Sequence, residues 1–347
     1  MSTVQPMAPL EPGGFRPRFP WLGGDLQTLR NVMRQPVHDL APWPAERLEL
    51  PLRDGSGDRL VASLHAGRHR GGEGSRGLVV LLHGLTGCED SLYIRASAAF
   101  WLARGRSVLR LNLRGAGPSR PLCGEQYHAG SSGDLRDALV ALRDLPGFDF
   151  GGGLYLVGYS LGANMLLRFL AEEAADFPVA AAASVSAPID LKAAQLRLMQ
   201  PRNWGYHRYL LGRMRAEALA TPRALTAVER AAILSADSVY AYDEQVIAPR
   251  NGFAGADDYY RQCSGLRFLP AIKTPTLVIH AKDDPWIPAQ AYERFDWSAH
   301  PSLAPLLSAR GGHVGFHGHG RPEAWHDLAA EAFFASLGGS GFPLAVW

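Results

Sequence analysis

Hydrophobic residues along this chain follow two patterns that alternate from residue 77 onward. Short apolar or β-branched runs bounded by glycine, proline or polar residues indicate buried strands, and longer segments of helix-forming residues between them indicate helices. Strands are expected at Gly77–Leu82, Ser107–Leu113, Gly153–Tyr159, Val179–Val185, Thr274–Ala281 and Leu303–Ala309. Helices are expected at Ser91–Arg104, Gly133–Asp144 and Leu161–Ala175. The alternation predicts an α/β fold, in which helices cover both faces of a mostly parallel sheet.

The alternation is interrupted between Pro188 and Thr274, a stretch far longer than an ordinary connection between strands. Helical segments are expected within it at Leu191–Met199, Tyr206–Ala218 and Arg223–Leu234. We interpret residues 189–269 as a helical cap inserted over the edge of the sheet at which the carboxyl ends of the parallel strands meet. Residues 46–188 and 270–347 would then form the α/β core.

The N-terminal part of the chain differs in composition. Residues 1–45 are rich in proline and glycine and are expected to form an extended arm that wraps the core. Glu46–Pro51 and Arg59–His65 are expected to pair as short antiparallel strands around a turn at residues 54–57. The glycine-rich, polar segment at residues 67–77 is expected to be a surface loop.

Composition and charge restrict the classes of protein to consider. Hydrophobic residues make up 47% and charged residues 20% of the 347 residues, which is ordinary for a globular protein with a large core. A net charge of +2 with scattered basic residues argues against nucleic-acid binding. The three cysteines show no disulfide framework, and we identify no signal peptide and no apolar run of about 18 residues. We therefore expect a cytoplasmic protein without an integral membrane segment, for which peripheral membrane contact stays open.

Gly158-Tyr159-Ser160-Leu161-Gly162 is the motif with the most chemical content. It joins an expected strand to the helix that begins at Leu161. A G-x-S-x-G sequence at such a junction is typical of a nucleophile elbow, where the serine occupies a strained turn and the glycines let strand and helix approach. The N-terminus of the helix favours negative charge near the serine. Ser160 is therefore the candidate nucleophile.

A serine hydroxyl attacks a carbonyl only when a base takes its proton and a carboxylate orients that base. In hydrolases of this architecture the chain order is serine, acid, histidine. Asp283 and Asp284 follow the strand expected to end at Ala281, and His313 follows the last expected strand. Because the carboxyl ends of parallel strands meet at one edge of a sheet, we expect Ser160, one of the two aspartates and His313 to come together.

The negative charge that develops on the substrate oxygen needs hydrogen-bond donors. In this class one donor is the backbone N–H after the nucleophile, here Leu161, and the other comes from the loop after an earlier strand. That loop is residues 83–87, and we assign Leu85 as the second donor, with Thr86 as the alternative. His83 is expected to shape this loop rather than to act as a base.

Other residues compete for these roles. Asp190, just after the strand that precedes the cap, is a rival acid, since some hydrolases take the acid from that position. His280, His317 and His319 are alternatives to His313. The cluster of His313, His317 and His319 suggests a metal site, but it lacks an obvious set of carboxylates, so no metal is expected.

These residues together resemble the α/β-hydrolase superfamily, and more closely its YheT-like (AB-hydrolase-4 type) branch of esterases and lipases. The resemblance covers most of the chain. It is carried by Leu26–Leu29, His83–Gly87, Asn112–Gly117, Tyr127–Gly130, Gly158–Asn164, Asp283–Pro285 and Gly311–Phe316. The family's Asp-x-x-x-Pro spacing falls on Asp284 and Pro288, so the resemblance selects Asp284 over Asp283. Asp25 stands where the family usually has a histidine, a departure that touches no catalytic residue.

The resemblance implies a serine carboxylesterase or lipase that acts on short- to medium-chain acyl esters, with monoacylglycerols or other lipid esters among the substrates of some members. Ser160 would attack the ester, His313 would take its proton, and Asp284 would orient the imidazole. The expected partner is a small ester or lipid, and no cofactor is implied. Two alternatives stay open: an acyltransferase that uses the same acyl-enzyme, and a non-catalytic binding protein on a hydrolase scaffold.

Overall fold

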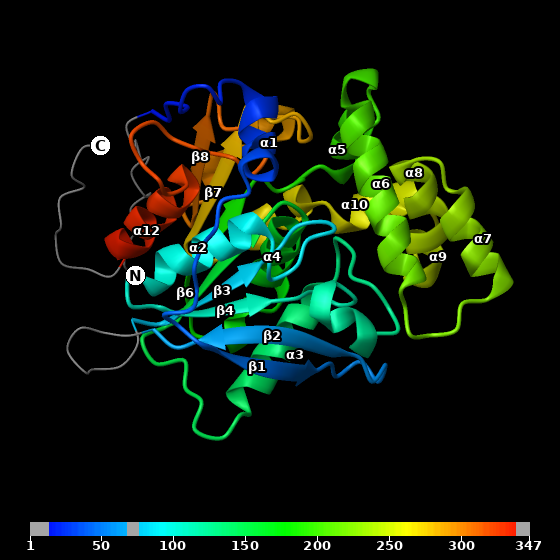
Figure 1. Ribbon diagram of the computed structural model, residues 1–347, viewed down its shortest axis with the longest axis horizontal. Helices are drawn as coiled ribbons and strands as arrows, with labels where there is room; N and C mark the ends of the chain where they lie inside the picture. The colour runs from blue at the N-terminus through cyan, green and yellow to red at the C-terminus, as the bar shows by residue number, and fades with distance from the viewer. Residues whose placement is uncertain (1–13, 68–75, 338–347) are drawn as a thin grey trace.

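The computed structural model describes residues 14–67 and 76–337, which are built around one eight-stranded sheet (Figure 1). The strands are β1 (Ala45–Pro51), β2 (Arg59–His65), β3 (Leu78–Leu82), β4 (Ser107–Leu111), β5 (Leu154–Tyr159), β6 (Val179–Val185), β7 (Thr276–Ala281) and β8 (Leu303–Ser308). Their order is β1-β2-β4-β3-β5-β6-β7-β8. β2 is antiparallel to both β1 and β4, and all other neighbours are parallel. The α/β fold predicted from the sequence is confirmed.

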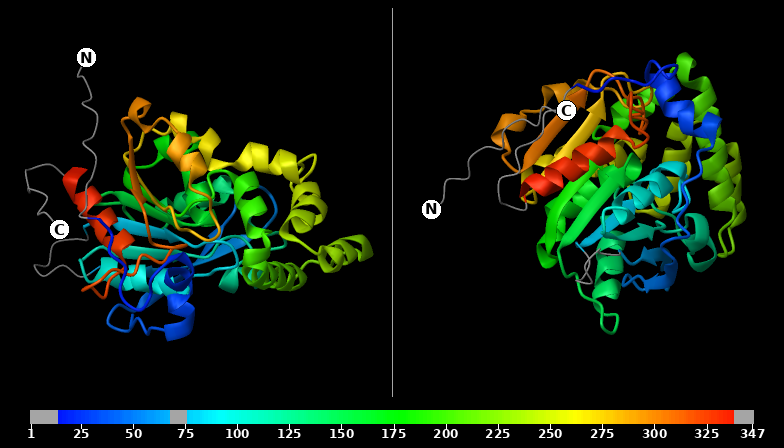
Figure 2. Two further views of the ribbon diagram at one scale, coloured as in Figure 1. Left: turned by 90° about the horizontal axis from the view of Figure 1, so that it is seen from above. Right: turned by 60° about the vertical axis from the view of Figure 1, so that its left-hand side comes forward.

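Helices cover both faces of the sheet (Figures 1 and 2). On one face, α2 (Leu92–Leu102) contacts β3 and β4, and α12 (Trp325–Leu337) contacts β6 and β7. On the other face, α3 (Ser132–Arg143) packs beside α4 (Leu161–Glu172), which contacts β5 and β6. The sequence analysis predicted α2, α3 and α4 to within a few residues but did not predict α12.

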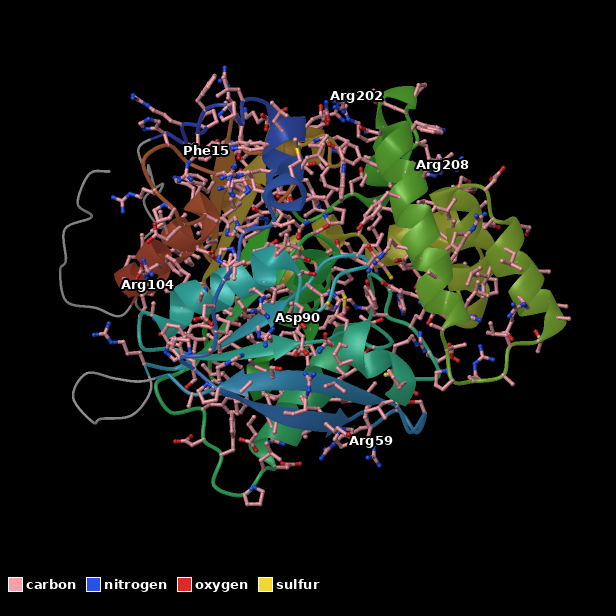
Figure 3. All side chains as sticks on the ribbon, viewed as in Figure 1. Phe15, Arg59, Asp90, Arg104, Arg202 and Arg208 are labelled. Atoms are coloured by element: carbon pink, nitrogen blue, oxygen red, sulfur yellow. The ribbon has the colours of Figure 1, made fainter. Side chains whose placement is uncertain are left out.

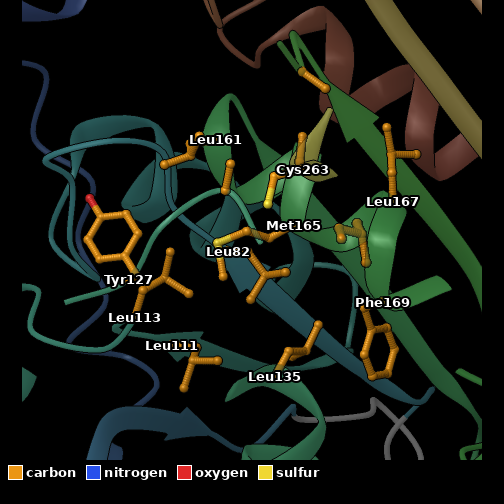
Figure 4. Close-up of a cluster of buried hydrophobic side chains, with 14 of the residues drawn as sticks. Leu82, Leu111, Leu113, Tyr127, Leu135, Leu161, Met165, Leu167, Phe169 and Cys263 are labelled. Atoms are coloured by element: carbon orange, nitrogen blue, oxygen red, sulfur yellow. The ribbon is translucent and has the colours of Figure 1, made fainter. Parts of the chain in front are cut away.

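The central strands are buried on both sides. Along β3, Val80 and Leu82 belong to the hydrophobic cluster on the α4 side, whereas Val79 and Leu81 belong to the cluster on the α2 and α12 side. Figure 4 shows part of the first cluster, in which Leu82 and Met165 of α4 are labelled. This burial on both faces explains why β3 is a continuous apolar run in the sequence and not an alternation of apolar and polar residues.

The chain between β6 and β7 is helical. Its helices are α5 (Leu191–Leu198), α6 (Trp204–Leu219), α7 (Ala227–Ser235), α8 (Val239–Tyr242), α9 (Ala248–Arg250) and α10 (Ala256–Cys263), with a π-helical turn at Asp243–Ile247. The three helices expected here correspond to α5, α6 and α7, which lie at the right in Figure 1. We keep the name cap for residues 189–269, whose division from the core stays a prediction.

The N-terminal arm is not extended throughout, contrary to the expectation. Residues Gly24–Arg34 form the helix α1. The composition of residues 1–45 as a whole hides this helix, because the segment from Asp25 to Gln35 contains neither proline nor glycine. Residues 1–13 of the arm, most of the loop expected at 67–77, and residues 338–347 lie outside the described part of the chain. Within that part, no helix is long and apolar enough to cross a membrane.

Candidate active site

Ser160 stands alone between β5 and α4, and its backbone lies in the left-handed region with φ of 52°. That conformation is strained for a residue with a side chain and is frequent at functional sites. The flanking glycines are needed because a Cβ on Gly162 would collide with the His83 carbonyl oxygen, and one on Gly158 would lie 2.7 Å from the Cα of Ala163. The two glycines therefore let α4 start directly at the serine, as the elbow motif requires.

The side chains of Ser160, His313 and Asp284 form one hydrogen-bonded chain. His313 Nε2 lies 2.9 Å from Ser160 Oγ, and His313 Nδ1 lies 2.8 Å from Asp284 Oδ2. The side chain of His313 is 4% exposed and that of Asp284 is fully buried. An ionised carboxylate only accepts hydrogen bonds, so Nδ1 carries the proton and the lone pair of Nε2 faces the serine hydroxyl.

Asp284 is held as an ionised acceptor. Its Oδ1 accepts the backbone N–H groups of Trp286 at 2.8 Å and Ile287 at 3.0 Å. Burial by itself would raise the pKa of this carboxyl. The charge and hydrogen bond of His313, together with His280 and the N–H of Ile287, outweigh that effect and hold the pKa below its usual value.

The rival acids occupy other positions. Asp283 Oδ1 accepts the backbone N–H of Gly312 at 2.9 Å, so this side chain supports the loop that carries His313 without bonding to the imidazole. Asp190 caps α5 by accepting the backbone N–H of Ala193 at 2.9 Å. The structure thus brings Asp284, and neither rival, into contact with His313.

His280 and His317, two of the rival histidines, are engaged elsewhere. His280 is buried on β7 and stacks on Tyr292 at a centroid distance of 4.1 Å, and burial lowers its pKa to about 4. His317 lies beside α1, where its Nδ1 is 3.4 Å from the guanidinium of Arg30. Among the described residues, no group of three or more His, Cys, Asp or Glu side chains is arranged to hold a metal ion.

The loop after β3 brings backbone N–H groups close to the serine. A Cβ on Gly84 would lie 2.8 Å from Ser160 Cβ, so the loop passes directly over the nucleophile. The N–H of Thr86 donates to the Tyr127 hydroxyl at 2.7 Å, which removes it as a free donor. No hydrogen bond within the described chain occupies the N–H of Leu85 or of Leu161, the two donors predicted from the sequence.

His83 fixes the shape of this loop. Its Nδ1 donates to the Gly84 carbonyl at 2.8 Å, and its Nε2 accepts the backbone N–H of Leu113 at 3.1 Å. Burial lowers the pKa of His83 to about 4, so the ring is neutral and both nitrogens are used. This arrangement agrees with the structural role expected for His83.

Ser160 faces a cavity of about 120 Å³ between the core and the helices of the cap. Most of its wall is apolar. The lining residues are Leu85, Tyr127, His128, Ser160, Leu161, Pro188, Leu191, Ala194, Gln195, Leu198, Leu210, Met214, Val239, Asp243, Ile247, Tyr259, Tyr260, Trp286 and Ile287. A larger groove of about 710 Å³ between α5 and α11 (Gln290–Arg294) contains none of the three residues of the hydrogen-bonded chain. The small cavity is therefore the one that serves the serine.

Helix α1 supports the site in a way that sequence reasoning missed. The buried side chain of Gln27 donates to the Trp21 and His317 carbonyls at 2.7 and 3.2 Å and accepts the His317 N–H at 2.7 Å. Asp25 pairs with Arg202 of the cap at 2.9 Å. Arg202 is labelled in Figure 3. The only signal was the Leu26–Leu29 motif, to which no role was assigned.

The fold and this geometry define an α/β hydrolase, and comparisons with known proteins agree. Residues 77–319 match the α/β-hydrolase fold family. The chain is 36% identical to "Putative esterase YheT" of Escherichia coli (strain K12), over 86% of each chain. It is 28% identical to a phospholipase ABHD3 of Mus musculus, over 70% of this chain and 59% of that protein. It is also 28% identical to a monoacylglycerol lipase of Saccharomyces cerevisiae, over 72% of this chain and 57% of that protein.

The solved structure of the Pyrococcus furiosus esterase Pf2001 superimposes with a TM-score of 0.58 over 85% of this chain and 92% of that one. At 18% sequence identity this likeness shows the fold alone. The chain therefore belongs to the α/β-hydrolase family, in its YheT-like branch, and is a carboxylic ester hydrolase. The match spans less than two thirds of the mouse and yeast relatives.

Proposed function

We propose that this protein is a serine carboxylesterase that hydrolyses short- to medium-chain acyl esters through Ser160, His313 and Asp284. The observation that carries the proposal is the continuous hydrogen-bonded chain of these side chains, with the serine facing a mostly apolar cavity. The order and geometry are those of a nucleophile, its base and the residue that orients the base.

In the proposed mechanism His313 Nε2 takes the Ser160 proton while Oγ attacks the ester carbonyl. The backbone N–H groups of Leu85 and Leu161 stabilise the oxyanion, a contribution worth about 3–4 kcal/mol per donor. Asp284 stabilises the imidazolium that forms. His313 then protonates the leaving alcohol, and a water molecule activated by the same base releases the acid from the serine.

The cavity suits the acyl part of an ester, because most of its wall is apolar. The names of the yeast monoacylglycerol lipase and of a yeast medium-chain fatty acid ethyl ester synthase/esterase support lipid esters as the substrate class. We keep a cytoplasmic location as part of the proposal, supported by Cys88, Cys123 and Cys263, all free thiols.

The decisive experiment measures hydrolysis of p-nitrophenyl esters of increasing acyl length by wild type and Ser160→Ala. We expect an optimum at short or medium chains and a fall of at least about 10³-fold in kcat for the variant. A fluorophosphonate probe should label wild type and leave Ser160→Ala unlabelled. Equal hydrolysis by the two proteins would overturn the assignment, and failure of the probe to label wild type would favour a binding protein on this scaffold.

Acyl transfer is the second candidate. It is supported by 29% identity, over 75% of this chain, to the yeast protein whose name combines ethyl ester synthase and esterase. The same acyl-enzyme would pass its acyl group to an alcohol in place of water. Product analysis in the presence of ethanol separates the two reactions, because a dominant ethyl ester would identify a transferase.

A further inference from the structure

The cavity wall contains a buried carboxyl group that the proposed mechanism does not use. Asp243 is 7% exposed and lines the same cavity as Ser160. It begins the π-helical turn Asp243–Ile247 between α8 and α9. Such turns are rare and are frequent at functional sites. Asp243 therefore lies opposite the core, on the cap side of the substrate space.

Within the part of the chain that the structure describes, one oxygen of Asp243 has a partner. The hydroxyl of Tyr260 donates to Oδ2 at 2.6 Å, and no donor within the described chain reaches Oδ1. The neighbouring wall residues Val239 and Ile247 are apolar. Burial raises the pKa of Asp243 to about 7, although the hydrogen bond from Tyr260 acts in the opposite direction. Oδ1 is therefore open to a donor from whatever occupies the cavity.

Asp243 is part of a polar strip on this wall. His128 and Tyr259 are in ring contact at 5.8 Å, and Tyr259 and Tyr260 at 5.4 Å. His128 Nδ1 accepts the Gly130 N–H at 3.1 Å, so the proton of the neutral ring is on Nε2. Burial lowers the pKa of His128 to about 4, which keeps the ring neutral. The strip thus offers an acceptor at Asp243 and a donor at His128, on a cavity wall that is mostly apolar.

We propose that this strip binds a hydroxyl group of the ester substrate, which donates its proton to Oδ1 of Asp243. A hydroxyl group can donate a proton, so it matches a carboxylate oxygen that no donor of the described chain reaches. A wholly apolar chain would displace water from Oδ1 and leave it without a partner. The inference rests on the proposed esterase function and adds the substrate class: hydroxylated esters, with the hydroxyl on either the alcohol or the acyl part.

The test compares kcat/KM for matched esters at about pH 8, where the carboxyl of Asp243 is ionised and Oδ1 accepts. Glycerol monobutyrate against propyl butyrate places the hydroxyl on the alcohol, and propyl 3-hydroxybutyrate against propyl butyrate places it on the acyl chain. We expect wild type to prefer the hydroxylated ester of at least one pair by about tenfold or more. Asp243→Leu should bring that ratio close to one. Tyr260→Phe removes the hydrogen bond to Asp243 but keeps the carboxyl, so it should keep the preference. This control shows whether the preference depends on the carboxyl of Asp243 or only on its hydrogen bond with Tyr260.

If Asp243→Leu does not fold, Asp243→Asn replaces it, because the amide keeps an oxygen for Tyr260 but presents N–H groups in place of the second acceptor. It should also lower the ratio. Wild-type ratios near one for both pairs, or a preference that survives both substitutions of Asp243, would overturn the inference.

Charge recognition is a third outcome. A preference for butyrylcholine over 3,3-dimethylbutyl butyrate that disappears in Asp243→Leu would mean that Asp243 attracts a cation, and would overturn the inference. If the protein hydrolyses neither these esters nor p-nitrophenyl esters, the proposed function is refuted, and this inference with it.

Discussion

Thr28 and His313 lie 285 positions apart in the sequence, yet the backbone N–H of His313 donates to the Thr28 hydroxyl at 2.8 Å. The hydroxyl in turn donates to the Gly24 carbonyl within α1 at 2.7 Å. A Cβ on Gly312 would lie 2.8 Å from the same hydroxyl oxygen, so helix and loop are in tight contact. An N-terminal helix thus fixes the backbone of the residue that faces the nucleophile.

The first prediction tests this contact. Thr28→Val keeps the shape of the side chain but leaves the His313 N–H without its acceptor, so the imidazole should lose its fixed position. We expect kcat to fall about tenfold with little change in KM, since small misplacements at a reacting group are costly. Thr28→Ser, which keeps the hydroxyl, should remain close to wild type in steady-state kinetics. An unchanged kcat in a Thr28→Val protein that is merely less stable would show that the contact supports folding alone.

The sequence predicted the sheet because β3, β5, β6 and β7 are buried on both faces and are therefore continuous apolar runs. Ser160 and His313 were predicted to meet because both follow parallel strands, and the structure brings them together. The pattern could not choose between Asp283 and Asp284, which follow the same strand. That choice depends on the path of the loop, and only the resemblance to a family selected Asp284.

Long-range contacts explain the other differences. Leu85 and Thr86 were both candidate oxyanion donors. The backbone N–H of Thr86 is not free for that role, because it donates to the hydroxyl of Tyr127. Such a contact between distant loops leaves no periodic signal in the sequence. Helix α1 was hidden by the proline and glycine on either side of it, and its purpose is evident only from its contacts with the loop of His313.

The second prediction separates the two aspartates. Asp284→Asn should lower kcat by about 10³- to 10⁴-fold, because an amide in place of the carboxylate favours the wrong tautomer of His313. Asp283→Asn is the matched control. It keeps an oxygen for the Gly312 N–H and should lose less than about tenfold, the cost of weakening one hydrogen bond. Initial rates on a p-nitrophenyl ester measure both, and a larger loss in Asp283→Asn would reverse the assignment of the acid.

The third prediction concerns the elbow. Gly162→Ala would push a methyl group against the backbone carbonyl of His83, which cannot move without shifting the loop that holds the Leu85 N–H. We expect a loss of about 1–3 kcal/mol in the free energy of unfolding and a lower kcat. Gly212→Ala on α6, where nothing lies within 4 Å of the added Cβ, should instead stabilise the protein by up to about 1 kcal/mol. Urea denaturation measures both, and equal effects would show that packing at the elbow is not tight.

The last prediction follows from the raised pKa of Asp243. Burial raises its pKa from 3.8 to about 7. Between about pH 4 and 7, therefore, this carboxyl is protonated in the folded protein and ionised in the unfolded chain. The contribution of this carboxyl to the free energy of unfolding is therefore fully present below pH 4 and falls as the pH rises toward 7. At 1.36 kcal/mol per pKa unit, the loss is up to about 4 kcal/mol. Asp243→Asn removes the titration. Relative to wild type, it should gain stability between pH 5 and 8 in urea denaturation, and a difference that does not change with pH would mean that Asp243 titrates normally.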